Sequence, residues 1–148
     1  MAKFDAFYTG TDEATQRLFR FFTFGFERSV GIRGPQKLVL QWLKCFMTTK
    51  GSDPTDLEYG TEFPNLIGSN VQTVQDARDV VLLCIQDCND QLMKIQQETQ
   101  PDLDELLLSA VLAKFDLTGA DGFDAYVTIS NVKNQEVTVN LPSLATRT

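Results

Sequence analysis

The sequence of 148 residues contains no histidine, and this absence narrows the chemistry that the protein can perform. Histidine is the commonest general base, the usual partner of a nucleophilic serine or cysteine, and the commonest metal ligand. Few hydrolase mechanisms remain without it. We therefore expect a protein that is not an enzyme and that carries no cofactor.

Long apolar runs and cysteine pairs are also scarce. No run approaches the roughly 20 apolar residues that cross a bilayer, and no signal-peptide pattern opens the sequence, so we expect neither a membrane span nor export. The cysteines are Cys45, Cys84 and Cys88, an odd set that fits a reducing compartment. Cys84 and Cys88 are spaced to share a helix face, but without a second pair at ligand spacing we expect buried small hydrophobes and no metal.

The formal charge of −7 is unevenly distributed. Residues 1–50 hold eight basic and four acidic side chains, whereas residues 51–148 hold five basic and sixteen acidic ones. Such an acidic chain is not expected to bind nucleic acid. The imbalance predicts that the two parts of the chain face different neighbours.

Residues 1–33 form a segment rich in aromatic and basic side chains. It holds seven of the eleven phenylalanines, interleaved with Arg17, Arg20 and Arg28. Aromatic side chains mixed with arginine are enriched at protein interfaces, which favours an arm that contacts a partner. The alternative, that the rings fold back onto the core of the same chain, is equally compatible with the sequence. The phenylalanines are Phe4, Phe7, Phe19, Phe21, Phe22, Phe24 and Phe26.

A first helix is predicted after Gly34-Pro35, because proline suits the first helical position, where its missing N–H costs nothing. Apolar residues follow at helical spacing as far as Phe46. The helix should end before Gly51, where turn-forming residues accumulate. Residues 34–72 thus hold one helix and an ordered, non-repetitive stretch.

The longest predicted element is a helix over residues 73–100. Its apolar residues recur every three or four positions, and four of them are seven apart, which is typical of a coiled-coil seam. A helix of about 27 residues spans roughly 40 Å, more than a domain of this size needs. A lone amphipathic helix usually lies on its own sheet, but the length and spacing favour a seam shared with other chains. The seam consists of Val74, Ala77, Val81, Cys84, Cys88, Leu92 and Ile95.

Residues 101–148 are predicted to form a small antiparallel sheet. Pro101 should end the long helix. Residues 125–130 and 136–141 alternate in polarity and are rich in β-branched side chains, so each predicts a strand, while residues 106–117 fit either a helix or a buried strand. The fold class is therefore α+β, and the small sheet leaves its edges open.

Short motifs along the chain resemble the tail baseplate wedge proteins of contractile-tailed bacteriophages, a family often called "lysozyme-like" wedge proteins. The resemblance covers roughly residues 28–142. It begins with Ser29-Val30-Gly31-Ile32-Arg33 and continues through a Lys-Gly-Ser-x-Pro-x-Asp loop, a Tyr-Gly turn, a long helix and a C-terminal β-hairpin module. Its register implies that residues 106–117 are a strand, giving about three strands. The matching loop residues are Lys50, Gly51, Ser52, Pro54, Asp56, Tyr59 and Gly60.

One motif departs from the family. Where the family usually has Glu-Pro-Arg-Ile, this chain has Gln100-Pro101-Asp102-Leu103. In the family this motif is understood to bind a helical bundle through charged hydrogen bonds. Either the partner of this chain has different charges, or the seam holds the bundle.

The resemblance implies a structural role. Such a subunit joins the wedge helical bundle to the first ring of the contractile sheath and templates sheath assembly. The implied partners are two copies of a larger wedge subunit, the tail sheath protein and, through the aromatic arm, central hub or tube proteins; the implied location is the virion baseplate, assembled in the host cytoplasm. The bundle interface comprises the seam with Gln100, Pro101 and Asp102. The expected sheath-facing residues are Tyr126, Val127, Ile129, Val137, Val139 and Leu141.

Other functions compete with this one. The family label suggests peptidoglycan cleavage, which needs two carboxylates in a cleft; Glu58 with Glu62, or the acidic group after Pro101, are the candidates, but neither has a surrounding sugar-site pattern. A baseplate subunit of a tailocin or a type VI secretion system belongs to the same family. An adaptor that forms a free coiled-coil dimer is disfavoured by the cysteines in the seam.

Overall fold

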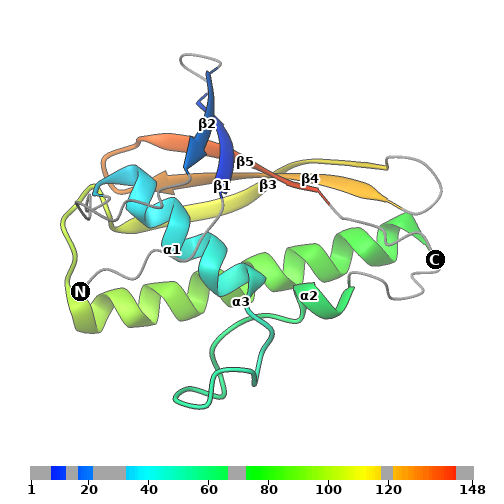
Figure 1. Ribbon diagram of the computed structural model, residues 1–148, viewed down its shortest axis with the longest axis horizontal. Helices are drawn as coiled ribbons and strands as arrows, with labels where there is room; N and C mark the ends of the chain where they lie inside the picture. The colour runs from blue at the N-terminus through cyan, green and yellow to red at the C-terminus, as the bar shows by residue number, and fades with distance from the viewer. Residues whose placement is uncertain (1–7, 13–16, 22–32, 67–72, 118–121, 143–148) are drawn as a thin grey trace.

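The structure, a computed structural model, describes residues 8–12, 17–21, 33–66, 73–117 and 122–142. A sheet lies on one side, and the two longer helices cover one of its faces (Figure 1). The α+β class is confirmed. The elements are β1 Tyr8–Asp12, β2 Arg17–Phe21, α1 Pro35–Met47, α2 Phe63–Leu66, α3 Val74–Thr99, β3 Leu107–Leu117, β4 Phe123–Asn131 and β5 Glu136–Pro142.

Both longer helices begin and end where local chemistry predicts. Pro35 is the first residue of α1. Thr73 caps α3, because its hydroxyl accepts a hydrogen bond from the Asp76 amide at 3.1 Å. Gln100 closes α3 in the left-handed conformation at φ 46°, and Pro101 cannot continue the helix. The predictions of both helices are confirmed.

The three C-terminal strands pair as an antiparallel meander, as predicted. β4 lies between β3 and β5, and the expected strand over residues 106–117 is present as β3, which begins one residue later, at Leu107. Register shifts interrupt β3 between Leu107 and Ser109 and between Leu112 and Lys114. Such bulges bend a strand and increase its local twist.

The sheet is larger than the sequence predicted. Its order is β2-β1-β5-β4-β3, so two strands of the N-terminal segment extend it. Thr11 of β1 is paired with Thr138 of β5, which places β5 inside the sheet and not at an open edge. Part of the expected arm thus belongs to the chain's own sheet. Where its phenylalanine side chains lie is outside the described part of the chain.

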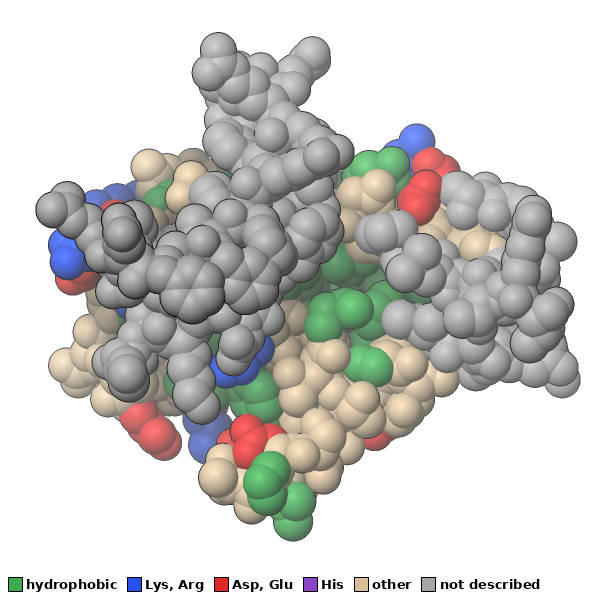
Figure 2. All heavy atoms as spheres, in the orientation of Figure 1, with side chains coloured by type: hydrophobic (Ala, Val, Ile, Leu, Met, Phe, Trp, Pro, Cys, Tyr) green, Lys and Arg blue, Asp and Glu red, His purple; other side chains and the backbone are tan. Residues whose placement is uncertain are grey.

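One hydrophobic core joins the helices and the sheet. A row of aromatic rings runs through it: Trp42 stacks on Phe46 at 4.8 Å between centroids, Phe46 meets Phe63 of α2 at 4.5 Å, and Phe63 meets Phe123 of β4 at 6.3 Å. Such pairs stabilise a core beyond their buried area. In Figure 2 hydrophobic side chains show at the centre of this face, with charged side chains mostly around them.

Candidate functional site

The predicted seam of α3 lies in the core of its own chain. Val81 and Cys88 are 0% exposed, and Ala77, Cys84 and Leu92 are also buried. The prediction of a seam shared with other chains is therefore wrong for these residues, because α1, α2 and the sheet already supply the apolar surface that covers them. Of the remaining seam positions, Val74 is exposed and Ile95 is half-buried.

The buried side of α3 also carries amide side chains that fix other elements. Asn89 accepts a hydrogen bond from the Trp42 indole at 2.8 Å and donates one to the Ala110 carbonyl at 2.9 Å. One side chain thus ties α3 to α1 and to the edge strand β3. The sequence analysis did not select Asn89.

Gln96 holds the segment that leads into β3. It is 3% exposed, donates to the Glu105 carbonyl at 2.9 Å and accepts from the Leu107 amide at 2.9 Å. The sequence contains a signal for the burial of Gln96, because Gln96 follows Leu92 by four residues and so continues the apolar stripe. A polar residue in such a stripe must find partners when it is buried.

A buried carboxylate fixes the same segment to α1. Glu105 is 4% exposed; its oxygens accept hydrogen bonds from the Gly34 amide at 3.2 Å and from Lys37 Nζ at 2.6 Å. A negative charge at a helix N-terminus is favourable, and the ion pair offsets the cost of burying the carboxylate. Glu105 therefore works as a remote cap of α1.

The segment between α3 and β3 borders a shallow apolar hollow. Gln100 and Asp102 are exposed and Pro101 is half-buried. Leu103, next in the chain, is 60% exposed. The residues at which the chain differs from the family motif are therefore exposed, and a partner can reach them. The hollow is lined by Met93, Gln96, Gln97, Gln100, Pro101, Leu106 and Leu107.

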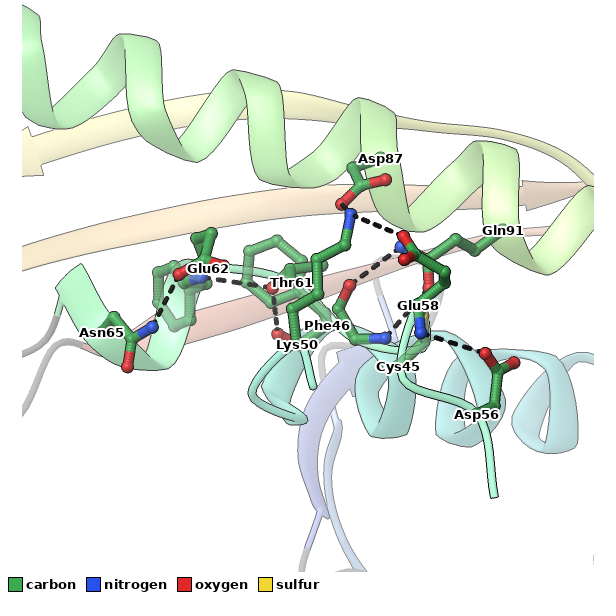
Figure 3. Close-up of polar contacts among 12 residues, drawn as sticks. Cys45, Phe46, Lys50, Asp56, Glu58, Thr61, Glu62, Asn65, Asp87 and Gln91 are labelled. Atoms are coloured by element: carbon green, nitrogen blue, oxygen red, sulfur yellow. Dashed lines mark hydrogen bonds and ion pairs between the residues drawn. The ribbon is translucent and has the colours of Figure 1, made fainter. Parts of the chain in front are cut away.

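Gln91 holds the loop over residues 50–60, which carries the motif that resembles the wedge family, against α3. Its side chain donates to the Gly60 carbonyl at 2.8 Å and accepts from the Gly60 amide at 3.0 Å. Gly60 has φ 105°, and a Cβ there would collide with the Thr48 carbonyl, so this position needs glycine. Thr61 is buried and its hydroxyl donates to the Phe46 carbonyl at 2.7 Å (Figure 3).

Most of the loop's other family residues are exposed. Tyr59 and Lys50 are the exceptions, and Tyr59 packs against the core. Burial raises the pKa of its phenol well above the usual range. Lys50 is half-buried and forms ion pairs with Glu58 at 3.9 Å and Asp87 at 3.6 Å. Gly51, Ser52, Pro54 and Asp56 are exposed.

The expected sheath-facing residues divide between the two faces of the sheet. Val127, Ile129, Val139 and Leu141 are buried in the core, and Val137 packs against it. The expectation that these side chains face a partner is therefore wrong, because their strand face is the one that the helices cover. Tyr126 lies on the other face, where Lys114 Nζ is 5.9 Å from its ring centroid.

The edge of β3 is the open one in the C-terminal part of the sheet. Among the described residues β3 has a strand on one side only. The Ala110 carbonyl already accepts a hydrogen bond from Asn89, so the residues of β3 after Ala110 are the ones available to pair with a further strand. Exposed apolar side chains accompany it, with Leu108 at 47% and Val111 at 53%.

The three cysteines are buried free thiols, as the sequence predicted for small hydrophobes. Burial raises the pKa of Cys88 and of Cys84, whereas a side-chain hydrogen bond with Cys88 lowers the pKa of Cys45. Within the described residues no group of three or more histidine, cysteine, aspartate or glutamate side chains is placed to hold a metal.

The carboxylates considered for hydrolysis are not arranged as a glycosidase pair. The Glu58 side chain is 88% exposed, and Glu62, also exposed, accepts a hydrogen bond from Asn65 at 2.6 Å. Neither has the desolvated surroundings that a general acid of this class uses. Glu105 is held by Lys37 in the contact described above.

Comparisons with family models, with curated proteins and with solved structures return no match for this chain. In the described part of the chain, no helix combines the length and the apolar character needed to cross a membrane.

Proposed function

We propose that this protein is a structural subunit of a contractile-tail baseplate, which joins the wedge to the first sheath ring and templates sheath assembly. The observation that carries the proposal is the edge strand β3, eleven residues long and paired on one side only in the described sheet. An unpaired edge offers backbone donors and acceptors to an incoming strand of a sheath protein. The motifs that resemble the wedge family support the assignment.

The burial of the seam changes where the wedge subunits would bind. The inner face of α3 is occupied, so the proposed contact with the larger wedge subunit moves to the hollow around Gln100 and Pro101. Leu103, 60% exposed, is the apolar anchor of this contact. Without the family's Glu and Arg, the contact depends on apolar packing and amide hydrogen bonds.

Proline in β3 tests the sheath contact. Ala113 is exposed and is the extra residue of the bulge between Leu112 and Lys114, a position at which an edge strand tolerates proline, so Ala113→Pro removes one backbone donor from β3. Ala113→Ser keeps the donor and is the matched control. With co-expressed wedge and sheath proteins, electron microscopy should show sheath rings for wild type and Ala113→Ser, and bare baseplates for Ala113→Pro.

The wedge contact has a separate test. Leu103→Ser should abolish co-purification with the larger wedge subunit while the isolated protein keeps its thermal midpoint. Sheath rings that form equally well with Ala113→Pro, or a wild-type chain that binds neither partner, would refute the proposed function. The same subunit role applies in tailocin and type VI secretion baseplates, and the genes adjacent to this one distinguish these settings.

A further inference from the structure

The two most exposed large hydrophobic side chains of the described residues lie on one acidic surface. Leu83 on α3 is 65% exposed, and Leu57 on the loop between α1 and α2 is 64% exposed. The loop projects from the helices on the side away from the sheet (Figure 1). Hydrophobic, acidic and basic side chains gather over this loop at the bottom of Figure 2. We call this region the Leu57/Leu83 surface.

The loop holds Leu57 in a fixed position. Gln91 pins the loop at Gly60 through two hydrogen bonds, 2.8 and 3.0 Å long. At the tip, Asp53 accepts hydrogen bonds from the Thr55 amide and hydroxyl, and Asp56 accepts one from the Glu58 amide at 3.1 Å. An apolar side chain on a pre-ordered loop loses little conformational entropy when a partner binds it.

An ion cluster joins the loop to the outer face of α3. Lys50 Nζ lies 3.9 Å from Glu58, which follows Leu57, and 3.6 Å from Asp87, which is one turn after Leu83 (Figure 3). The two leucines are therefore parts of one surface contributed by two elements. This connection depends on the tertiary structure, since the two leucines are far apart in the sequence.

The charges around the leucines are mostly negative. Leu83 lies in a row with Asp79, Asp87 and Asp90, spaced by four, four and three residues along one helix face, and Lys94, four residues after Asp90, continues this row with one positive charge. From Asp79 to Asp90 the row extends over roughly 16 Å at 1.5 Å per residue. Asp53, Asp56 and Glu58 add three carboxylates from the loop, against the lysines Lys44 and Lys50. Hydrogen bonds from Thr55 lower the pKa of Asp53 and favour its charged form.

We propose that the Leu57/Leu83 surface docks a basic amphipathic helix of a partner protein. The partner helix presents an apolar stripe to Leu57 and Leu83 and flanks it with lysine or arginine at three- and four-residue spacing. Such a helix matches the row of aspartates along α3 in both charge and period. The partner's apolar stripe covers leucines that are otherwise exposed to water. This inference does not rest on the proposed baseplate function.

A synthetic helix tests the proposal directly. The probe is a labelled 21-residue peptide of leucine and lysine with an amphipathic helical pattern, and binding to the full chain is measured by fluorescence anisotropy. A scrambled peptide of the same composition and a leucine–glutamate peptide are the comparison probes. We expect the amphipathic lysine peptide to bind at least about tenfold more tightly than either, because only it matches apolar stripe and charge together.

Chain variants locate the contact. The double variant Leu57→Ser/Leu83→Ser should weaken binding about tenfold, the equivalent of losing one well-buried anchor. Val74→Ser, at an exposed apolar residue on the opposite side of α3 from Leu83, should change binding less than about twofold. Equal thermal midpoints show that the variants fold. Wedge and sheath proteins are absent, so the outcome is independent of the baseplate proposal.

Several results would overturn the proposal. Equal binding of the scrambled and amphipathic peptides would show attraction by charge alone. Equal losses in the double variant and in Val74→Ser would place the contact elsewhere. Sedimentation supplies a further outcome: wild-type self-association that Leu57→Ser abolishes would identify a second copy of the chain as the occupant.

Discussion

The inner face of α3 carries Val81, Cys88 and Leu92, each 4% exposed or less, whereas its outer face carries Leu83, 65% exposed, among aspartates. Both faces belong to one helix of 26 residues. The inner face has the regular apolar spacing, and its residues pack in the core of the chain. The outer face has Leu83 between acidic residues and remains open. The comparison shows that apolar spacing identifies which face is buried but not which chain buries it.

The largest expected effect separates the two faces. Val81→Asp places a carboxylate in the core without a partner and should cost about 4 kcal/mol or more of unfolding free energy. Leu83→Asp on the outer face should cost only about 1 kcal/mol, from its lower helix propensity and from repulsion by Asp79 and Asp87. Urea unfolding followed by circular dichroism measures both. A cooperative Val81→Asp transition at the wild-type midpoint would contradict the buried position of the seam.

A smaller effect tests the buried amide of Gln96. Gln96→Met keeps a similar shape but leaves the Glu105 carbonyl and the Leu107 amide without their partner, which should cost about 1–3 kcal/mol. Gln97, one position further on, is exposed, so Gln97→Met serves as the control. Equal unfolding free energies for the two variants would mean that the bonds of Gln96 add nothing to stability.

The dependence of folding stability on pH above about 9 tests how Tyr59, at the foot of the loop, packs against the core. The pKa of Tyr59 is raised in the folded state by burial, so the folded chain keeps a proton that the unfolded chain releases above about pH 10. The contribution of the Tyr59 phenol to the free energy of unfolding is fully present below about pH 10. It falls as the pH rises further, by at most about 1.4 kcal/mol per pH unit. Tyr59→Phe should flatten this fall in thermal midpoints measured from pH 9 to 11.

The buried thiols of Cys84 and Cys88 also affect folding stability at alkaline pH, and they provide an internal check. Burial raises the pKa of Cys84 and Cys88, so the stability that they contribute begins to fall above about pH 8.5, whereas the lowered pKa of Cys45 acts in the opposite direction. Tyr59→Phe should therefore leave the slope between pH 8.5 and 9.5 unchanged. An equal fall in stability above about pH 10 for wild type and Tyr59→Phe would assign the alkaline loss to the thiols.

The smallest expected effect concerns the exposed ion cluster. Lys50→Met removes the ion pairs with Asp87 and Glu58, whose side chains are 39% and 88% exposed. Exposed pairs contribute little, so the loss should stay within about 0.5 kcal/mol at low salt and disappear at high salt. A loss above 1 kcal/mol in urea unfolding would mean that Lys50 is part of the core contact and not of the outer surface.

Much of the secondary structure was predictable because its signals are local. Pro35 at a helix start, Thr73 as a cap and Pro101 after the helix end each act within a few residues, and the β-branched alternation of residues 125–130 does the same. Of the edges that were expected to be open, β3 lies at an edge of the sheet and β5 does not, because β1 pairs with it. Pairing between Thr11 and Thr138 depends on residues far apart in sequence, and no local pattern encodes it.

The partner surface was the least predictable feature. A helix of this length repeats fewer than four heptads, and over that distance a period of 3.5 differs little from 3.6, so spacing alone does not separate a coiled coil from an amphipathic helix. The amide side chains of Asn89 and Gln91 have no periodic signature. Their partners, Ala110 and Gly60, are identified only once the chain is folded.

The sequence was sufficient for the fold class, for the positions of α1, α3 and the C-terminal strands, and for the burial of Val81, Cys84 and Cys88 on one helix face. These follow from capping, turn formation and periodicity, which act between neighbouring residues. Only the tertiary structure decided which layer covers α3, that Glu105 caps α1 across 71 positions, and that Leu57 and Leu83 share one open surface. Such contacts depend on how well distant surfaces fit together, which no short stretch of sequence specifies.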